Sequence, residues 1–311
     1  HLKKRWRQTI HEYRQEQPKA SLIGLCRLFG YSKQAYYKHL SCRNRQWQSR
    51  TAALDLVHEV RCKLPRLGTR KLHYMLQQDF RKEKIGRDKL FTILREQGML
   101  ISKKRRYTKT TNSSHWMRKY PNIVKNVLII RPEQVWVSDI TYIETIDSFQ
   151  YLHLVTDAYS KRIMGYKLSS GMSAADTAEA LTMAISARKY PSLPLIHHSD
   201  RGLQYCSSLY TAILQHNEIA ISMTEQSDPY ENAVAERING ILKDEFGLAD
   251  RFEDIKQLQF QVEQSIDLYN NLRPHLSNQM LTPNQMHRQH QKPVKYYKKK
   301  APVNQYLPVL K

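Results

Sequence analysis

The sequence predicts an α+β protein in which a basic, all-helical N-terminal region precedes a domain built on one mixed sheet. Residues 1–130 hold 31 Lys and Arg against 8 Asp and Glu, whereas the remaining residues hold 19 against 20. Apolar residues recur at helical spacing over the first 110 residues and in short β-rich runs after residue 131. A soluble basic surface is one explanation of the charge, but its steep asymmetry favours a polyanion-binding region joined to a neutral domain.

Length and composition set the broad class. The 311 residues are enough for two domains. The mean hydropathy is -0.65, no apolar run approaches the ~20 residues of a membrane span, and no signal peptide is evident. The 4 cysteines are scattered, which favours reduced thiols in a cytosol over structural zinc. Because the first residue is His1, we expect a processed, fused or recombinant chain with sequence upstream.

Residues 1–45 are predicted to form a helix-turn-helix DNA-binding region after a first helix over residues 2–16. Helical spacing places the next helix over residues 22–29, which Gly30 ends, and Ser32 is a suitable N-cap for the helix that follows. A generic helical hairpin has the same pattern, but the surrounding positive charge favours DNA binding. The second helix of the pair offers three side chains to DNA: Lys33, Gln34 and Lys38.

Residues 46–102 are predicted to form a second helical DNA-binding region. It holds a helix over residues 50–64 and two short helices that begin near Thr69 and Asp88, a pattern typical of a winged or bihelical unit.

Residues 103–130 are predicted to be a basic linker. No acidic residue interrupts the basic and polar residues between 103 and 125. We therefore expect a segment that becomes ordered on phosphate. Its candidate DNA contacts are Lys103, Lys104, Arg105 and Arg106.

An α+β domain is predicted over residues 131–250, because strands and helices alternate there. The predicted strands cover residues 134–143, 151–157, 162–168, 195–198 and 219–223, and the clearest helices cover 174–188 and 232–246. Residues 251–311 add a helix over 252–270 and a basic tail with little periodicity.

Three carboxylates are the candidate catalytic and metal-binding residues. Asp139 interrupts a β-rich run, where Asp is disfavoured; Asp200 directly follows a short apolar strand; and Glu236 lies among alanines in a helix. Two-metal phosphodiester chemistry needs carboxylates that converge from different elements, since Mg²⁺ prefers oxygen ligands. The plain alternatives are an edge-strand or capping aspartate, a turn aspartate and a solvated helix glutamate.

The motifs around these carboxylates resemble those of the DDE transposase and retroviral-integrase superfamily. Asp200 and Glu236 are separated by 35 residues, as in the D…D-35-E signature of that superfamily. The sequence is closer still to the OrfB-type transposases of bacterial insertion sequences. Four family motifs stand in order, at residues 136–142, 198–205, 231–243 and 269–283.

The resemblance implies a ribonuclease-H-like core with two Mg²⁺ (or Mn²⁺) ions on the three carboxylates. It implies double-stranded DNA as the partner, a homo-oligomeric synaptic complex, no membrane, and a place in the bacterial cytoplasm or nucleoid. The expected activity is nicking and strand transfer at the terminal inverted repeats of an insertion sequence. Further candidate DNA contacts in or beside the motifs are Arg201, Asn232, Lys243, Arg273 and His275.

Two other functions fit the same carboxylates. A ribonuclease-H-type nuclease would use only water as the nucleophile, but the large basic region argues against it. A DNA-binding regulator with an inactive second half is disfavoured because all three carboxylates are present. We interpret Asp157 as a structural or turn residue. His197 and His198 are interpreted as supporting groups, since this metal site favours oxygen.

Overall fold

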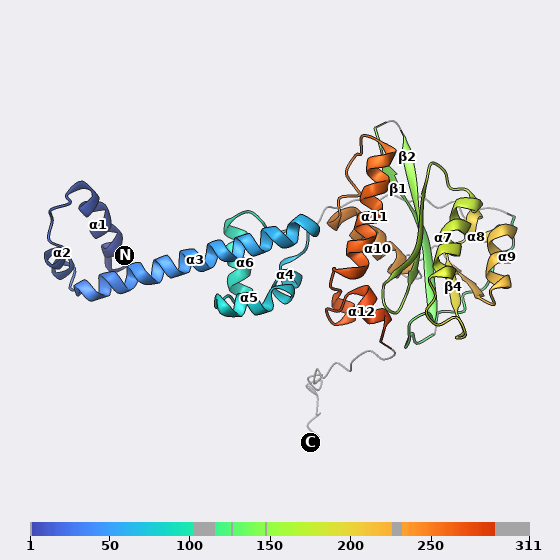
Figure 1. Ribbon diagram of the computed structural model, residues 1–311, viewed down its shortest axis with the longest axis horizontal. Coiled ribbons are helices and arrows are strands. Elements are labelled where there is room, and N and C mark those ends of the chain that lie inside the picture. Colours follow the sequence, from blue (N-terminus) through green and yellow to red (C-terminus); the bar gives the residue numbers. More distant parts are fainter. Residues whose placement is uncertain (1, 103–115, 126, 147, 226–231, 290–311) are drawn as a thin grey trace, which may run out of the picture. The chain divides into compact units, whose positions relative to one another are not determined.

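The computed structural model describes residues 2–102, 116–125, 127–146, 148–225 and 232–289. It divides into two compact units, His1–Lys103 and Lys104–Lys311, each of which is described by itself (Figure 1). The four basic residues predicted to contact DNA from the linker, Lys103, Lys104, Arg105 and Arg106, lie outside the described residues.

The first unit begins with three helices, α1 (Leu2–Glu16), α2 (Leu22–Leu28) and α3 (Lys33–Lys63). Gly30 adopts a φ of 74° after α2, a conformation that costs glycine little. The Ser32 hydroxyl accepts a hydrogen bond from the Ala35 amide at 3.1 Å and caps α3, as the sequence predicts. Trp6 stacks on Tyr31 with 4.1 Å between ring centroids and anchors the small core of these helices.

Helix α3 is continuous through residues 45 and 46, where the sequence analysis places a domain division. Its 31 residues contain neither Gly nor Pro, so nothing in the backbone chemistry forces a break. The helix predicted from residue 50 is therefore the second half of α3.

The rest of the first unit packs on the C-terminal half of α3. It consists of α4 (Thr69–Met75), α5 (Gln77–Lys82) and α6 (Arg87–Glu96). Helix α6 packs against both α3 and α4. Arg61 of α3 donates hydrogen bonds to the carbonyls of Met99 at 2.9 Å and Leu67 at 3.3 Å, which ties the chain on both sides of these helices to α3.

The second unit is built on a five-stranded mixed sheet with the order β3-β2-β1-β4-β5. Strands β1, β2 and β3 pair antiparallel, while β4 pairs parallel with both β1 and β5. Their bounds are Val135–Glu144 (β1), Phe149–Asp157 (β2), Ile163–Ser169 (β3), Ile196–Ser199 (β4) and Ala220–Met223 (β5). The predicted mixed sheet and α+β class are confirmed.

Helices cover both faces of this sheet (Figure 1). One face carries α7 (Ala174–Ser186), α8 (Leu203–Cys206) and α9 (Ser208–His216). The other carries α10 (Ala233–Glu245), α11 (Ile255–Asn271) and α12 (Pro283–His287). At Gly165 of β3, an added Cβ would lie only 2.7 Å from the Ala184 nitrogen and closer still to the Ala180 carbonyl. Glycine therefore allows α7 to approach the sheet.

Hydrogen bonds from neighbouring segments occupy part of each edge strand, β3 and β5. The Asn270 side chain of α11 bonds to both the N–H and the carbonyl of Ile163 on β3, each at 3.0 Å. Beside β5, the Met223 N–H donates to the Pro121 carbonyl, and the Ile123 N–H donates to the Ser222 hydroxyl. Helix α11 thus packs as part of the unit that carries the sheet, across the division predicted at residue 250. None of the described helices is long and apolar enough to cross a membrane.

Candidate active site beside β1 and β4

Parallel pairing of β1 with β4 brings Asp139 and Asp200 together. The register that pairs Val135 with Ile196 also sets Asp139 level with Asp200, four residues further along each segment. Val135 and Ile196 both pack in the core next to α10. Because side chains alternate along a strand, the two carboxylates project on the same face as this pair.

Helix α10 brings Glu236 to that face. The Asn232 amide donates to the Ser138 carbonyl at 3.1 Å, and the Asn239 amide donates to Asp139 Oδ2 at 2.7 Å. Glu236 lies four residues after Asn232 and three before Asn239, so all three share one helix face. The helix therefore presents Glu236 toward the segment of β1 that carries Asp139.

The three carboxylates interact electrostatically. Burial and the negative charge of Asp200, with a smaller contribution from Glu236, raise the pKa of Asp139 to about 7. Burial also raises the pKa of Glu236. Among the residues that the structure describes, no three His, Cys, Asp or Glu side chains are close enough to enclose an ion.

Hydrogen bonds orient the two aspartates. The Ile140 N–H donates to Asp139 Oδ1 at 2.9 Å, opposite the bond from Asn239 to Oδ2. The Gly202 N–H donates to Asp200 Oδ1, also at 2.9 Å. An added Cβ at Gly202 would lie 3.0 Å from that oxygen. Glycine at this position therefore allows the backbone N–H to approach the Asp200 carboxylate.

The two histidines before Asp200 each contact hydroxyl groups of neighbouring elements. His197 Nε2 lies 2.7 Å from the Ser138 hydroxyl and 2.9 Å from the Tyr210 hydroxyl. Burial lowers the pKa of His197 to about 3, so this ring is neutral. His198 Nδ1 lies 2.9 Å from the Ser222 hydroxyl. Both side chains are buried, as their interpretation as supporting groups requires.

The candidate DNA contacts of the first unit are on the surface. Lys33, Gln34 and Lys38 are exposed on the first turns of α3. Lys33 Nζ lies 5.8 Å from the centroid of the Tyr37 ring. Contact between these side chains and DNA stays a prediction.

The candidate DNA contacts of the second unit divide into two groups. Arg201 and Lys243 are half-buried, the first next to Asp200 and the second two turns after Glu236 on α10. Asn232 is buried, and its amide is engaged by the Ser138 carbonyl.

Arg273 and His275 are buried inside the second unit. The Arg273 guanidinium forms a two-point ion pair with Glu245, at 2.8 and 2.6 Å, and only 1% of the residue is exposed. His275 packs edge-on against Tyr269 with 5.1 Å between ring centroids. This placement favours a structural role for both residues over the DNA contact predicted from the sequence.

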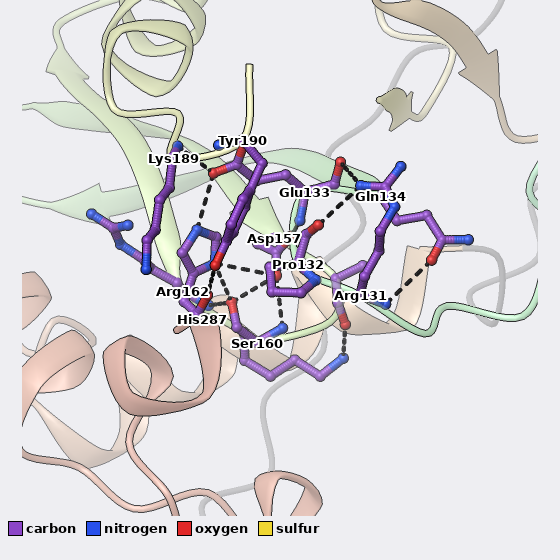
Figure 2. Close-up of polar contacts among 12 residues, drawn as sticks. Arg131, Pro132, Glu133, Gln134, Asp157, Ser160, Arg162, Lys189, Tyr190 and His287 are labelled. Carbon is purple, nitrogen blue, oxygen red and sulfur yellow. Dashed lines mark hydrogen bonds and ion pairs between the residues drawn. The ribbon is translucent and has the colours of Figure 1, made fainter. Parts of the chain in front are cut away.

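No sequence pattern predicts the buried polar network near the start of β1 (Figure 2). His287 of α12 lies between two carboxylates, with Nε2 at 3.1 Å from Glu133 and Nδ1 at 3.7 Å from Asp157. Asp157 also accepts hydrogen bonds from the Glu133 N–H at 2.7 Å and the Ser160 hydroxyl at 2.6 Å. All four residues are buried. Asp157 therefore has the structural role expected for it.

Charge pairing dominates this network. Burial alone would raise the pKa of Glu133, but hydrogen bonds from His287 and from the backbone of Lys189 and Tyr190 outweigh it and lower that pKa. Burial would lower the pKa of His287, yet its bonds to Asp157 and Glu133 outweigh it and raise that pKa. The network thus favours a cationic imidazole that fastens α12 to the sheet.

Comparison with known proteins identifies the family. Two models of the integrase core domain match residues 130–229 and 217–283. An uncharacterized 31 kDa protein of insertion element IS600 from Shigella sonnei is 32% identical over 81% of this chain and 93% of its own length. The transposase of insertion sequence IS629, also from Shigella sonnei, is 31% identical over 66% of this chain and 68% of its own length. The chain belongs to the insertion-sequence transposases.

Other similarities agree with a transposase that carries an integrase core. The InsF transposase of IS3A from Escherichia coli (strain K12) is 33% identical over 48% of this chain and 52% of its own length. Both integrase-core matches fall within the unit that carries the mixed sheet. Among solved structures, the HTLV-2 integrase catalytic core in complex with magnesium is 21% identical, covers 50% of this chain and 97% of its own, and has a TM-score of 0.40.

The transposase has one site residue that the sequence analysis does not single out, Asn239. Its amide holds Asp139 Oδ2. If Asp139 binds metal as the sequence predicts, we expect Asn239→Ala to reduce DNA joining by about 10- to 100-fold, the usual cost of removing a group that orients a metal ligand. Single-turnover joining rates at several Mg²⁺ concentrations measure this effect. Asn271→Ala, at the exposed end of α11, is the control, and equal rates for both variants would contradict the assigned role.

Proposed function

We propose that this transposase binds the terminal inverted repeats of its insertion sequence and catalyses metal-dependent nicking and strand transfer, which integrates the element. The observation that carries the proposal is the convergence of β1, the end of β4 and α10, which bring Asp139, Asp200 and Glu236 to one site. The raised pKa of Asp139 agrees with this placement. Like charges held together in a partly buried site are costly unless a cation neutralises them. The cluster lies in the integrase core of the chain.

The chemistry of the donor set, rather than its spacing in this structure, supports two Mg²⁺ or Mn²⁺ ions held by Asp139, Asp200 and Glu236. All three donors are oxygen ligands, which these ions prefer, and they come from a strand, a strand end and a helix. When bound, two such ions lower the pKa of the attacking hydroxyl and stabilise the leaving oxygen of an in-line displacement.

The protein's own groups orient the reaction. Asn239 and the Ile140 N–H fix the Asp139 carboxylate, and the Gly202 N–H fixes Asp200. With the Asp139 and Asp200 carboxylates fixed in this way, water first cleaves a phosphodiester at the element's end and leaves a 3′-hydroxyl. That hydroxyl then attacks a target phosphodiester, so one P–O bond forms as another breaks.

Double-stranded DNA is the proposed partner, both as element end and as target. Support comes from the positive charge before residue 131 and from the exposed Lys33, Gln34 and Lys38 on α3. Two ends must be held together for integration, so we propose a homo-oligomer, a dimer or larger, in the synaptic complex. The bacterial cytoplasm or nucleoid is the corresponding location.

A strand-transfer assay tests the proposal against its two alternatives. The full chain is incubated with Mg²⁺, element-end DNA labelled at the 5′ end of the strand that is transferred, and an unlabelled target plasmid. Labelled ends joined to the plasmid support the proposal. Hydrolysis without joining would replace it with a ribonuclease-H-type nuclease, and binding without either product would replace it with a DNA-binding regulator.

Salt dependence tests the DNA-binding assignment of the basic region. The logarithm of the binding constant should fall linearly with the logarithm of salt concentration, with a slope of about -0.9 per phosphate neutralised. We expect Lys33→Gln combined with Lys38→Gln to make this slope shallower by the amount that corresponds to one or two lost phosphate contacts. Fluorescence anisotropy measures the binding constants. Lys256→Gln, on an exposed face of α11, should leave the slope unchanged. An affinity that does not respond to salt would contradict the charge argument.

A further inference from the structure

An exposed aromatic ring lies on β2, beside the part of β1 that follows Asp139. Phe149, the first residue of β2, is 52% exposed. Its ring meets the Tyr142 ring of β1 edge-on, with 5.7 Å between centroids and an interplanar angle of 83°. The Tyr142 ring contacts one side of the Phe149 ring, and the remaining part of the Phe149 ring is exposed to solvent.

A positive charge adjoins the same pair of rings. Lys243 Nζ of α10 lies 4.2 Å from the centroid of the Tyr142 ring, well within the range of a cation–π contact. Lys243 follows Glu236 by seven residues, two turns further along the same helix face. Together, Tyr142, Phe149 and Lys243 form what we call the aromatic ledge.

The ledge is positioned along the strand that carries Asp139. Tyr142 follows Asp139 by three residues, about 10 Å along a strand. The described pairing of β4 with β1 ends at Val137, and β4 itself ends at Ser199. The next pairing on this edge of β1 is the bridge from Thr145 to Phe252. Among the described residues, the part of β1 between Asp139 and Glu144 therefore has no strand partner on this edge, around which Lys243 of α10 reaches the Tyr142 ring.

The charges around the ledge favour an anionic ligand. Glu144, the register partner of Phe149, is paired with Arg251 at 2.8 Å. That ion pair neutralises the carboxylate opposite Phe149, and the Lys243 ammonium group lies beside the rings. An apolar ring face next to a cation matches the two parts of a nucleotide, a base that stacks and a phosphate that carries negative charge.

We propose that the aromatic ledge binds an unpaired nucleobase of the DNA strand that reacts at the carboxylates. Phe149 stacks on the base, Tyr142 packs against the Phe149 ring, and Lys243 forms an ionic contact with the adjoining phosphate. This inference rests on the proposed function, because it takes DNA at the carboxylates as the substrate. The ledge selects a DNA end whose terminal base pairs open easily, since an unpaired base must be available to stack.

Photocrosslinking tests the ledge directly. One thymine at a time near the element's end is replaced by 5-iodouracil, which crosslinks to an aromatic ring stacked on it. The full chain is bound to this DNA with Ca²⁺ in place of Mg²⁺, irradiated, and digested for mass spectrometry. We expect a crosslink to Phe149 from one or two neighbouring positions. Crosslinks that map only elsewhere would overturn the proposal.

Matched variants complete the test. Phe149→Ala should weaken binding of frayed or pre-opened DNA ends by about 5- to 150-fold, the range for loss of one base–aromatic stack. Phe149→Trp should retain binding, and Phe260→Ala, which removes a 63% exposed phenylalanine of α11, is the control. Equal affinity of the Phe149→Ala and Phe260→Ala proteins would overturn the proposal.

The remaining outcomes are distinguishable. If sedimentation shows that Phe149→Ala dissociates an oligomer and no Phe149 crosslink forms, the ring contacts a second copy of the chain and the proposal is overturned. If the wild type joins DNA but Phe149 neither crosslinks nor affects affinity, the ledge is wrong and the proposed function stands. If Phe149 crosslinks but no joining occurs, the proposed function fails while the stacking site is supported.

Discussion

Asp139→Asn, Asp200→Asn and Glu236→Gln are each expected to lower DNA joining by at least about a thousand-fold while DNA binding persists. Each substitution keeps the shape of the side chain and removes one negative charge from a cluster whose charges already interact. Loss of a metal ligand costs several kcal/mol of transition-state stabilisation, and each 1.36 kcal/mol is a factor of about ten. Single-turnover joining with labelled ends measures the effect, and anisotropy measures binding.

The control is Glu253→Gln, which makes the same chemical change at an exposed residue away from the site. It should join DNA at the wild-type rate. The basic first unit supplies most of the affinity in this account, so the three active-site variants should bind element ends within a few-fold of wild type. Loss of binding in all three, or wild-type joining by any of them, would refute the assignment of the carboxylates.

His287→Ala is expected to lower the free energy of unfolding of the second unit by about 3–5 kcal/mol. The substitution removes the cation between Glu133 and Asp157 and leaves Glu133 with Arg188, at 3.4 Å, as its remaining ion-pair partner. Removing one partner of a buried ion pair typically costs this much, because the remaining charge has no compensation. Urea denaturation of the full chain, followed by far-UV circular dichroism and tyrosine fluorescence, measures the change.

The same network predicts a pH window for stability. The pKa of His287 is raised above its ordinary value of 6.5, so its contribution is fully present below that value and is lost as pH rises through the folded-state pKa. The pKa of Glu133 is lowered from 4.5, so its contribution is present above that value and is lost as pH falls through the folded-state pKa. Both contributions are complete between about pH 4.5 and 6.5.

His216→Ala is the matched control, since it removes an exposed histidine at the end of α9. It should leave both stability and its pH profile near those of wild type. A His287→Ala protein whose unfolding midpoint changes with pH just as the wild type does would show that the imidazole is not the charged link between the two carboxylates.

Local patterns in the sequence account for much of the fold. Alternation and β-rich runs place all five strands to within about two residues, because one sheet with buried faces imposes that pattern on the chain. Ser32 and Gly30 mark a helix start and a helix end by chemistry that depends only on neighbouring residues. The convergence of Asp139 and Asp200 follows from parallel pairing, which the order of elements implies.

Features that depend on contacts between residues far apart in the sequence cannot be predicted from such local patterns. Glu133 and His287 are 154 residues apart, and neither position is flanked by a pattern that indicates burial. Arg273 stands in a conspicuous motif, but only its ion pair with Glu245 shows that the side chain points inward. The continuity of α3 is not predicted either, because a polar stretch between two apolar ones resembles a linker until both ends are seen packed.

The Asn270 side chain of α11, which bonds to the edge strand β3, bears on how copies of this protein avoid associating through their sheet edges. Its amide uses both backbone groups of Ile163, the first residue of that edge strand, while residues 121 and 123 engage the opposite edge at β5. Unpaired strand edges are templates for intermolecular sheet growth. Copies concentrated on one DNA molecule would meet edge to edge often, and these two local covers oppose aggregation by that route.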